Sequence, residues 1–168
     1  ELMQQELWPY QPLFNEGLAS IMVAHLSMPQ LDPEPHVPST LSKTIVTDIL
    51  RNQMKFDGLV LTDAMNMQGV AKYFPAGEAD IRALIAGNDI VLFPLDVPLA
   101  IKKVKEALAT GRITEADINE KVLRILKAKE LASVNKKMKI QLKGIHDDLN
   151  NGDAIRIKRE LIEASITQ

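Results

Sequence analysis

The chain contains no cysteine. Thiolate metal sites, cysteine nucleophiles and disulfides are therefore excluded, although this absence does not separate the bacterial cytoplasm from the periplasm, and the localisation stays open. No apolar run reaches the roughly 18 residues that a membrane span needs, and the first residues do not resemble a signal peptide. The sequence begins with Glu1 rather than Met, which indicates a piece whose upstream sequence is missing.

The chain also lacks a large excess of one charge. It contains 20 Lys and Arg and 22 Asp and Glu, which gives a formal net charge of −2. Neither nucleic acid nor an anionic membrane surface is expected as a partner. Glycine-rich phosphate-binding motifs are absent as well. With 46% hydrophobic and 25% charged residues, the composition is that of an ordinary globular domain.

No metal or other cofactor is expected. Asp32, Glu34 and His36 lie close together in the sequence, but prolines separate or flank them and no ordered ligand spacing recurs. The lysines that gather after residue 133 are interpreted as a solvated face rather than a binding patch.

Three short apolar runs, at residues 20–24, 59–62 and 90–93, do not alternate with polar residues. Such runs are typical of parallel strands buried on both faces. Gly17, Gly58 and Gly87 precede them, where glycine can end a helix or turn the chain into a strand. The spacing predicts consecutive βα units, in either a doubly wound sheet or a barrel.

Helices are predicted between and after these strands. One begins after Ser39 or Thr40, carries an apolar face at i, i+4 spacing and ends near Met54. Asp96 is a predicted N-cap, and Thr114 with Asp117 resembles a capping box. A further short helix is predicted over residues 154–162.

Three strands are too few to close a barrel, and the outer strands would keep unpaired N–H and C=O groups. The sequence therefore predicts that the missing N-terminal part, or another copy of the chain, covers these edges.

In both parallel architectures the site lies at the C-terminal ends of the strands. Asp63 directly follows the second apolar run, so desolvation and substrate contact can act on its carboxylate together. A helix cap or a loop turn is an equally acceptable role for Asp63 from its position alone.

The surrounding sequence, KFDGLVLTDAMNMQGV at residues 55–70, resembles the nucleophile strand and loop of family-three glycoside hydrolases. The β-N-acetylglucosaminidase branch of that family carries F-D-G, an apolar strand and S/T-D-x-L/M-x-M. Residues 21–26 and 86–92 are similar to the preceding and final barrel strands, and residues 99–131 to the two helices that close the barrel.

The resemblance implies an α/β fold in which residues 1–133 are the C-terminal portion of a (β/α)8 TIM-type barrel. Residues 134–168 are then a helical C-terminal extension or linker toward a missing domain.

By this resemblance, Asp63 is the catalytic nucleophile of a retaining exo-β-N-acetylglucosaminidase, and carbohydrate is the substrate, with peptidoglycan fragments as a candidate. His25 and Met67 are expected to line the substrate site, His25 in a structural or lining role rather than as a proton donor. The family's acid/base, a His held by an Asp, and its K-H-x-P-G motif are not in this sequence. The chain alone is therefore expected to be inactive.

Other functions remain open. Ala64 favours the hexosaminidase branch, because the β-glucosidase branch usually has Trp after the nucleophile, but a β-glucosidase is the nearest alternative. A phosphoacceptor signalling domain also places Asp after an apolar strand, yet the acidic cluster and the later lysine that it needs are absent. A non-catalytic scaffold is the third reading.

Overall fold

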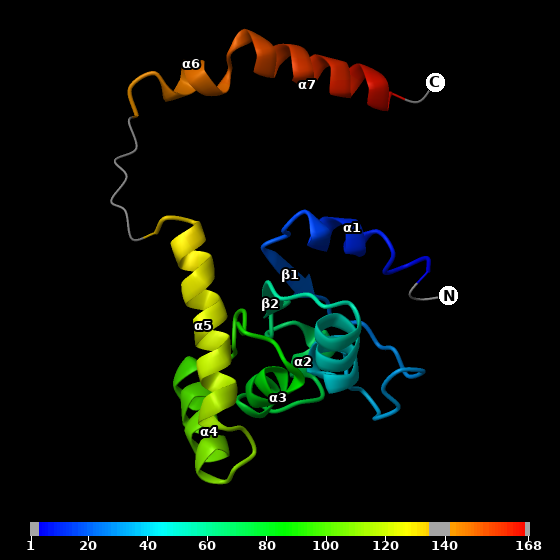
Figure 1. The fold of residues 1–168 in the computed structure, drawn as a ribbon, viewed down its shortest axis with the longest axis vertical. Coiled ribbons are helices and arrows are strands. Elements are labelled where there is room, and N and C mark those ends of the chain that lie inside the picture. Colours follow the sequence, from blue (N-terminus) through cyan, green and yellow to red (C-terminus); the bar gives the residue numbers. More distant parts are fainter. Residues whose placement is uncertain (1–3, 135–141, 167–168) are drawn as a thin grey trace. The chain divides into compact units, whose positions relative to one another are not determined.

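The computed structural model describes residues 4–134 and 142–166, which form two separate units divided after Val134. The first unit contains a small parallel sheet and helices (Figure 1). Its elements are α1 (Tyr10–Asn15), β1 (Ser20–Val23), the 3-10 turn η1 (Ser39–Leu41), the π-helix η2 (Thr44–Gln53), β2 (Leu59–Thr62), α2 (Gln68–Ala71), α3 (Glu78–Ala86), α4 (Val97–Ala109) and α5 (Glu115–Leu131).

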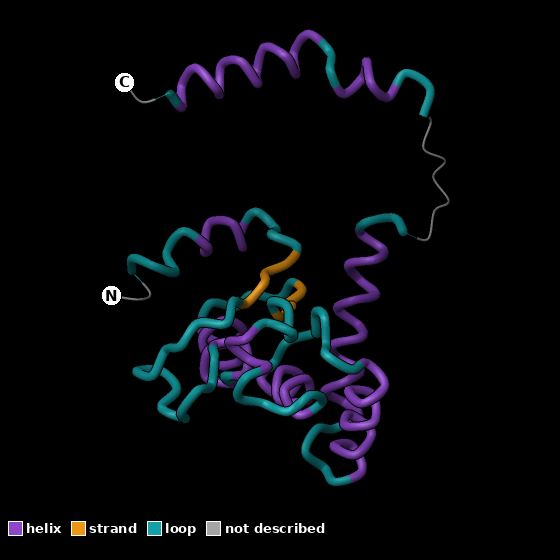
Figure 2. The backbone as a smooth tube through the Cα atoms, turned by 180° about the vertical axis from the view of Figure 1, so that it is seen from behind, coloured by secondary structure: helices purple, strands orange, loops and turns teal. Residues whose placement is uncertain are grey.

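β1 and β2 pair in parallel, with Ser20 opposite Leu59 and Val23 opposite Thr62. The two strands lie side by side (Figure 2), and helix η2 connects them, as expected for a βα unit. Two of the three predicted strands are therefore confirmed, together with their parallel direction.

The third predicted strand, at residues 90–93, is reduced to a parallel bridge between Leu61 and Ile90. This segment runs beside β2 and the loop after it. Two backbone hydrogen bonds hold it there, from Thr62 N–H to the Ile90 carbonyl (3.1 Å) and from Met65 N–H to the Leu92 carbonyl (2.9 Å). Leu92 N–H is bound by the Thr62 hydroxyl at 2.9 Å instead of a backbone carbonyl. The segment bends at Phe93, whose φ is 47°.

The helix between β1 and β2 begins later than predicted and is wound more widely. Ser39 and Thr40 lie in η1 and do not cap it. Its backbone bonds reach five residues back, as from Met54 N–H to the Ile49 carbonyl at 2.8 Å. Thr44, Ile45, Val46 and Thr47 are consecutive β-branched residues, which lowers the preference for a tight α-turn.

The predicted caps of the later helices are confirmed. The Asp96 carboxylate accepts a hydrogen bond from Leu99 N–H at 2.9 Å at the start of α4. Thr114 and Asp117 form the predicted capping box at the start of α5. The second unit contains α6 (Ile145–Leu149) and α7 (Gly152–Ser165), so the predicted helix at residues 154–162 is present and longer.

One face of the sheet is packed and the other is open. Val23 and Val60 are buried against the helices in a cluster with Val46, Phe56 and Ala86. Because side chains alternate along a strand, Met22, Leu61 and Asp63 belong to the opposite face. Met22 is 51% exposed there. Asp63 therefore emerges on the face that the described helices leave uncovered.

Candidate active site

Asp63 directly follows β2 and is anchored through its backbone to β1. Its N–H donates to the Val23 carbonyl at 3.0 Å, and its Oδ1 accepts from Ala64 N–H at 2.7 Å. The side chain is half-buried. No cation pairs with this carboxylate in residues 4–134 and 142–166, so one oxygen remains available to an electrophile.

The Ala64 carbonyl links His25 and Met67 to the residue that follows Asp63. It accepts from the Nε2 of His25 at 3.0 Å and from the N–H of Met67 at 3.1 Å. Both contacts hold the residue next to Asp63, so they fix the loop that presents the carboxylate. The side chains of His25, Asp63 and Met67 come from the exits of two adjacent strands.

His25 is held at both ring nitrogens. A carbonyl only accepts, so Nε2 must carry a proton toward Ala64. Nδ1 lies 2.7 Å from the Thr40 hydroxyl, which also lies 2.8 Å from the Ala24 carbonyl. The Thr40 hydroxyl can donate its proton to Nδ1, and the imidazole ring is then neutral. If it donates to the Ala24 carbonyl instead, Nδ1 must donate to the Thr40 oxygen, and the ring is then an imidazolium. In both states Nε2–H holds the loop, which makes His25 a positioning residue.

The two methionines of the loop differ. Met65 is 2% exposed and belongs to a core cluster with Val37, Leu41, Val70 and Phe74, so it is a packing residue. Met67 is 45% exposed and precedes α2. Of the two, only Met67 exposes its side chain to solvent.

The Pro-rich loop at residues 27–38 is closed at its base by the antiparallel bridge between Ser27 and Pro38. His36, with a φ of 65°, stacks on Tyr73 at a ring separation of 4.1 Å. Glu34 forms an ion pair with Arg82 at 2.9 Å. Within the described residues, no group of three or more acidic or His side chains could hold a metal ion.

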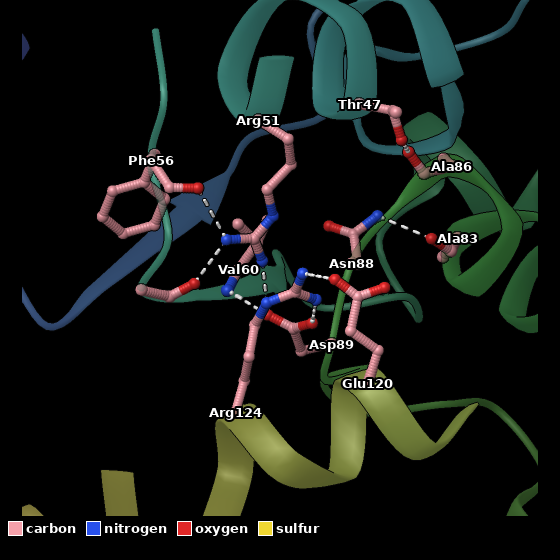
Figure 3. A network of polar contacts seen from close by, with 11 residues as sticks. Thr47, Arg51, Phe56, Val60, Ala83, Ala86, Asn88, Asp89, Glu120 and Arg124 are labelled. Carbon is pink, nitrogen blue, oxygen red and sulfur yellow. Dashed lines mark hydrogen bonds and ion pairs between the residues drawn. The ribbon is translucent and has the colours of Figure 1, made fainter. Parts of the chain in front are cut away.

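Asp89 lies at the opposite end of the sheet, just before the third segment (Figure 3). Its side chain is fully buried and pairs with Arg51 at 2.6 Å and Arg124 at 3.0 Å. It also accepts from Val60 N–H at 2.8 Å. Arg51 additionally donates to the Phe56 and Gly58 carbonyls at 3.0 and 2.6 Å. This network clamps the N-terminal end of β2 to η2 and α5.

Sequence reasoning missed the roles of Thr40 and of the Ala64 carbonyl. From the sequence, Thr40 is expected only as a helix cap. In the structure it is completely buried and lies beside His25. A backbone carbonyl carries no residue-type signal, so no sequence pattern could identify Ala64.

None of the described helices is both long and apolar enough to cross a membrane.

A parallel βα frame with a carboxylate at a strand exit is common to many α/β enzymes, and comparison with known proteins identifies the family. The profile of the glycosyl hydrolase family 3 N terminal domain matches residues 1–128. The chain therefore belongs to glycosyl hydrolase family 3, whose N-terminal domain has a TIM-barrel-like fold.

Three relatives illustrate the similarity. β-Hexosaminidase A of Pseudoalteromonas piscicida is 27% identical over all of this chain and 31% of its own length. The structure of a family 3 β-N-acetylglucosaminidase from Paenibacillus sp. str. FPU-7 matches 82% of this chain and 26% of that one, with 31% identity and a TM-score of 0.76. The β-glucoside phosphorylase BglX matches 92% of this chain and 29% of that one, with 28% identity and a TM-score of 0.79. The chain thus spans about a third or less of the length of these relatives.

Proposed function

We propose that this chain carries the nucleophile of a retaining β-N-acetylglucosaminidase, and that Asp63 is that nucleophile. The observation that carries the proposal is the half-buried, cation-free carboxylate of Asp63, held at the exit of β2 by a loop that is fixed from both sides. Family membership and the hexosaminidase and N-acetylglucosaminidase names of its relatives support the same conclusion.

In the proposed reaction an Asp63 oxygen attacks the anomeric carbon while a proton donor protonates the leaving oxygen. The bond to the leaving group breaks and a covalent glycosyl-enzyme forms. Water then attacks the same carbon, gives a proton to the now deprotonated donor and releases the Asp63 carboxylate, so two inversions give net retention of configuration. His25 positions the nucleophile loop through Ala64, and Met67 lines the sugar site.

The proton donor is proposed to come from the part of the protein outside this chain. Both ring nitrogens of His25 are engaged by Thr40 and Ala64, so His25 is poorly placed to protonate a leaving group. By family resemblance the donor is a His paired with an Asp on a loop absent from residues 1–168. The substrate is proposed to be a terminal β-linked N-acetylglucosamine, with peptidoglycan fragments as a candidate source.

The chain is further proposed to be the C-terminal portion of the barrel, with residues 134–168 as an extension toward another domain. The open sheet face at Met22 and Leu61 and the one-sided pairing of residues 90–93 support this. In a closed barrel both would be covered by the preceding strands. Size-exclusion chromatography and thermal unfolding of the isolated chain test it: a cooperative monomer would contradict the proposal.

The activity itself is tested with the full-length protein and a chromogenic N-acetyl-β-glucosaminide. Asp63→Asn is expected to lower kcat by about a thousandfold or more, because a neutral amide replaces the nucleophilic carboxylate. Asp96→Asn is the matched control, since asparagine also caps helices and α4 should persist. Equal activity of Asp63→Asn and wild type would contradict the assignment. Faster cleavage of a plain β-glucoside would favour the β-glucosidase alternative.

A further inference from the structure

A second cavity lies at the end of the sheet opposite Asp63. It has a volume of about 410 Å³ and is enclosed by η2, α3, α5 and the turn between α4 and α5. Five of its lining residues are cationic and two are anionic: Lys43, Arg51, Arg112, Lys121, Arg124, Asp117 and Glu120. None of these residues belongs to the proposed catalytic loop.

Most of these charges are paired. Arg51 and Arg124 share Asp89, and Arg124 also contacts Glu120. Arg112 makes a bidentate pair with Glu78, at 2.7 and 3.1 Å. Asp117 is used in the capping box with Thr114. After this pairing, Lys43 and Lys121 face the cavity with Asp117 as their shared acidic neighbour, so the site keeps an excess of positive charge.

Lys121 is the unusual member. It is only 8% exposed, and no carboxylate in the described parts of the chain pairs with it. Burial is the largest influence on its ammonium group and lowers the pKa of Lys121. Asp89 and Asp117 raise it, whereas Arg124 and Arg51 act in the same direction as burial. A buried ammonium without a direct counter-ion is costly, and an anion in the adjacent cavity would remove that cost.

We propose that this cavity is a binding site for a small phosphate-type oxyanion, contacted by Lys121 and Lys43 and attracted by the surrounding guanidinium groups. Lys43, just before η2, and Lys121 of α5 line the same space from two sides, which suits an anion with several equivalent oxygens. The volume exceeds that of inorganic phosphate, so a phosphomonoester also fits. The site is independent of the proposed glycosidase activity.

The inference is tested by titrating the full-length protein with inorganic phosphate and with glycerol 2-phosphate, by calorimetry and thermal unfolding at matched ionic strength with chloride as reference. Both phosphates are expected to bind and to raise the unfolding temperature. Tighter binding of glycerol 2-phosphate would indicate a phosphorylated metabolite as ligand, and tighter binding of inorganic phosphate would indicate the free ion.

Lys121→Met is expected to weaken phosphate binding about tenfold or more, because a charge-assisted contact is lost while the buried volume is kept. Lys43→Met, at an exposed position, should weaken binding without affecting folding. Lys102→Met, which removes an exposed lysine of α4, is the control and should bind normally. Asp63→Asn should also bind normally, which separates this cavity from phosphate binding at the sugar site. Failure of phosphate to bind, or equal binding by wild type, Lys121→Met and Lys43→Met, would overturn the proposal.

Discussion

Two aspartates at opposite ends of the same small sheet have contrasting environments. Asp89 is fully buried and bound by two arginines and the N–H of Val60. Asp63, just after the opposite end of β2, is half-buried, and within the described residues its carboxylate accepts one hydrogen bond, from Ala64 N–H. The same functional group is thus fully neutralised at one end and left available at the other. In parallel βα barrels the N-terminal ends of strands serve stability and the C-terminal ends carry chemistry, which is the division proposed for these two aspartates.

Of the substitutions considered for these two ends of the sheet, the largest loss of stability is predicted at Asp89. Asp89→Asn removes the negative charge that the partly buried guanidinium groups of Arg51 and Arg124 share, and is expected to lower the free energy of unfolding by about 3–5 kcal/mol. Chemical unfolding of the full-length protein measures this. Asp48→Asn, at an exposed position of η2, is the control and should change stability by under about 0.5 kcal/mol. Comparable losses for both variants would remove the structural role assigned to Asp89.

A smaller loss is predicted where α3 turns back toward the sheet. Gly87 has a φ of 119°, and an added Cβ would lie 2.6 Å from the Thr47 hydroxyl, which is itself bound to the Ala86 carbonyl at 2.7 Å. Gly87→Ala is expected to cost about 3 kcal/mol, from backbone strain and the clash together.

Substitution of Gly111 separates the backbone strain from the steric clash. Its φ is 72°, but an added Cβ would meet nothing within 4 Å. Gly111→Ala should therefore cost only about 1–2 kcal/mol, the price of the left-handed conformation. If both variants unfold at the same denaturant concentration, packing at Thr47 does not constrain this turn.

The smallest effect is expected at His25, which connects the two strand exits without touching the reacting carbon. His25→Ala removes the bonds to Thr40 and Ala64, and should lower kcat about tenfold with little change in KM, since a loosened loop presents Asp63 less accurately. His25→Gln retains an N–H for the Ala64 carbonyl and should restore part of the loss. His36→Ala is the control, because His36 stacks on Tyr73 in an exposed loop. A change confined to KM, or no rescue by glutamine, would argue against positioning.

Features that depend on neighbouring residues in the sequence were predictable. Asp96 caps α4, and Thr114 with Asp117 caps α5, because an N-cap needs only the backbone N–H groups of the next turn. The two paired strands and their parallel direction followed from uninterrupted apolar runs. Asp63 could be singled out because it ends such a run.

Features that depend on distant segments were not predictable. Residues 90–93 form a bridge rather than a full strand although their apolar run resembles the other two, so no local pattern distinguishes them. Arg51 and Arg124 are 38 and 35 residues from Asp89, so their convergence required the folded chain. The bond from His25 to the Ala64 carbonyl spans 39 residues. The predicted roles of Asp63, His25 and Met67 remain predictions, now with a defined geometry.

Trapping the glycosyl-enzyme tests the central claim most directly. The full-length protein is treated with a fluorinated N-acetylglucosaminide carrying a good leaving group, digested, and mapped by mass spectrometry. A retaining mechanism with Asp63 as nucleophile predicts a stable sugar adduct on the peptide that contains Asp63, absent from Asp63→Asn. An adduct on another residue of the wild-type protein would contradict the assignment.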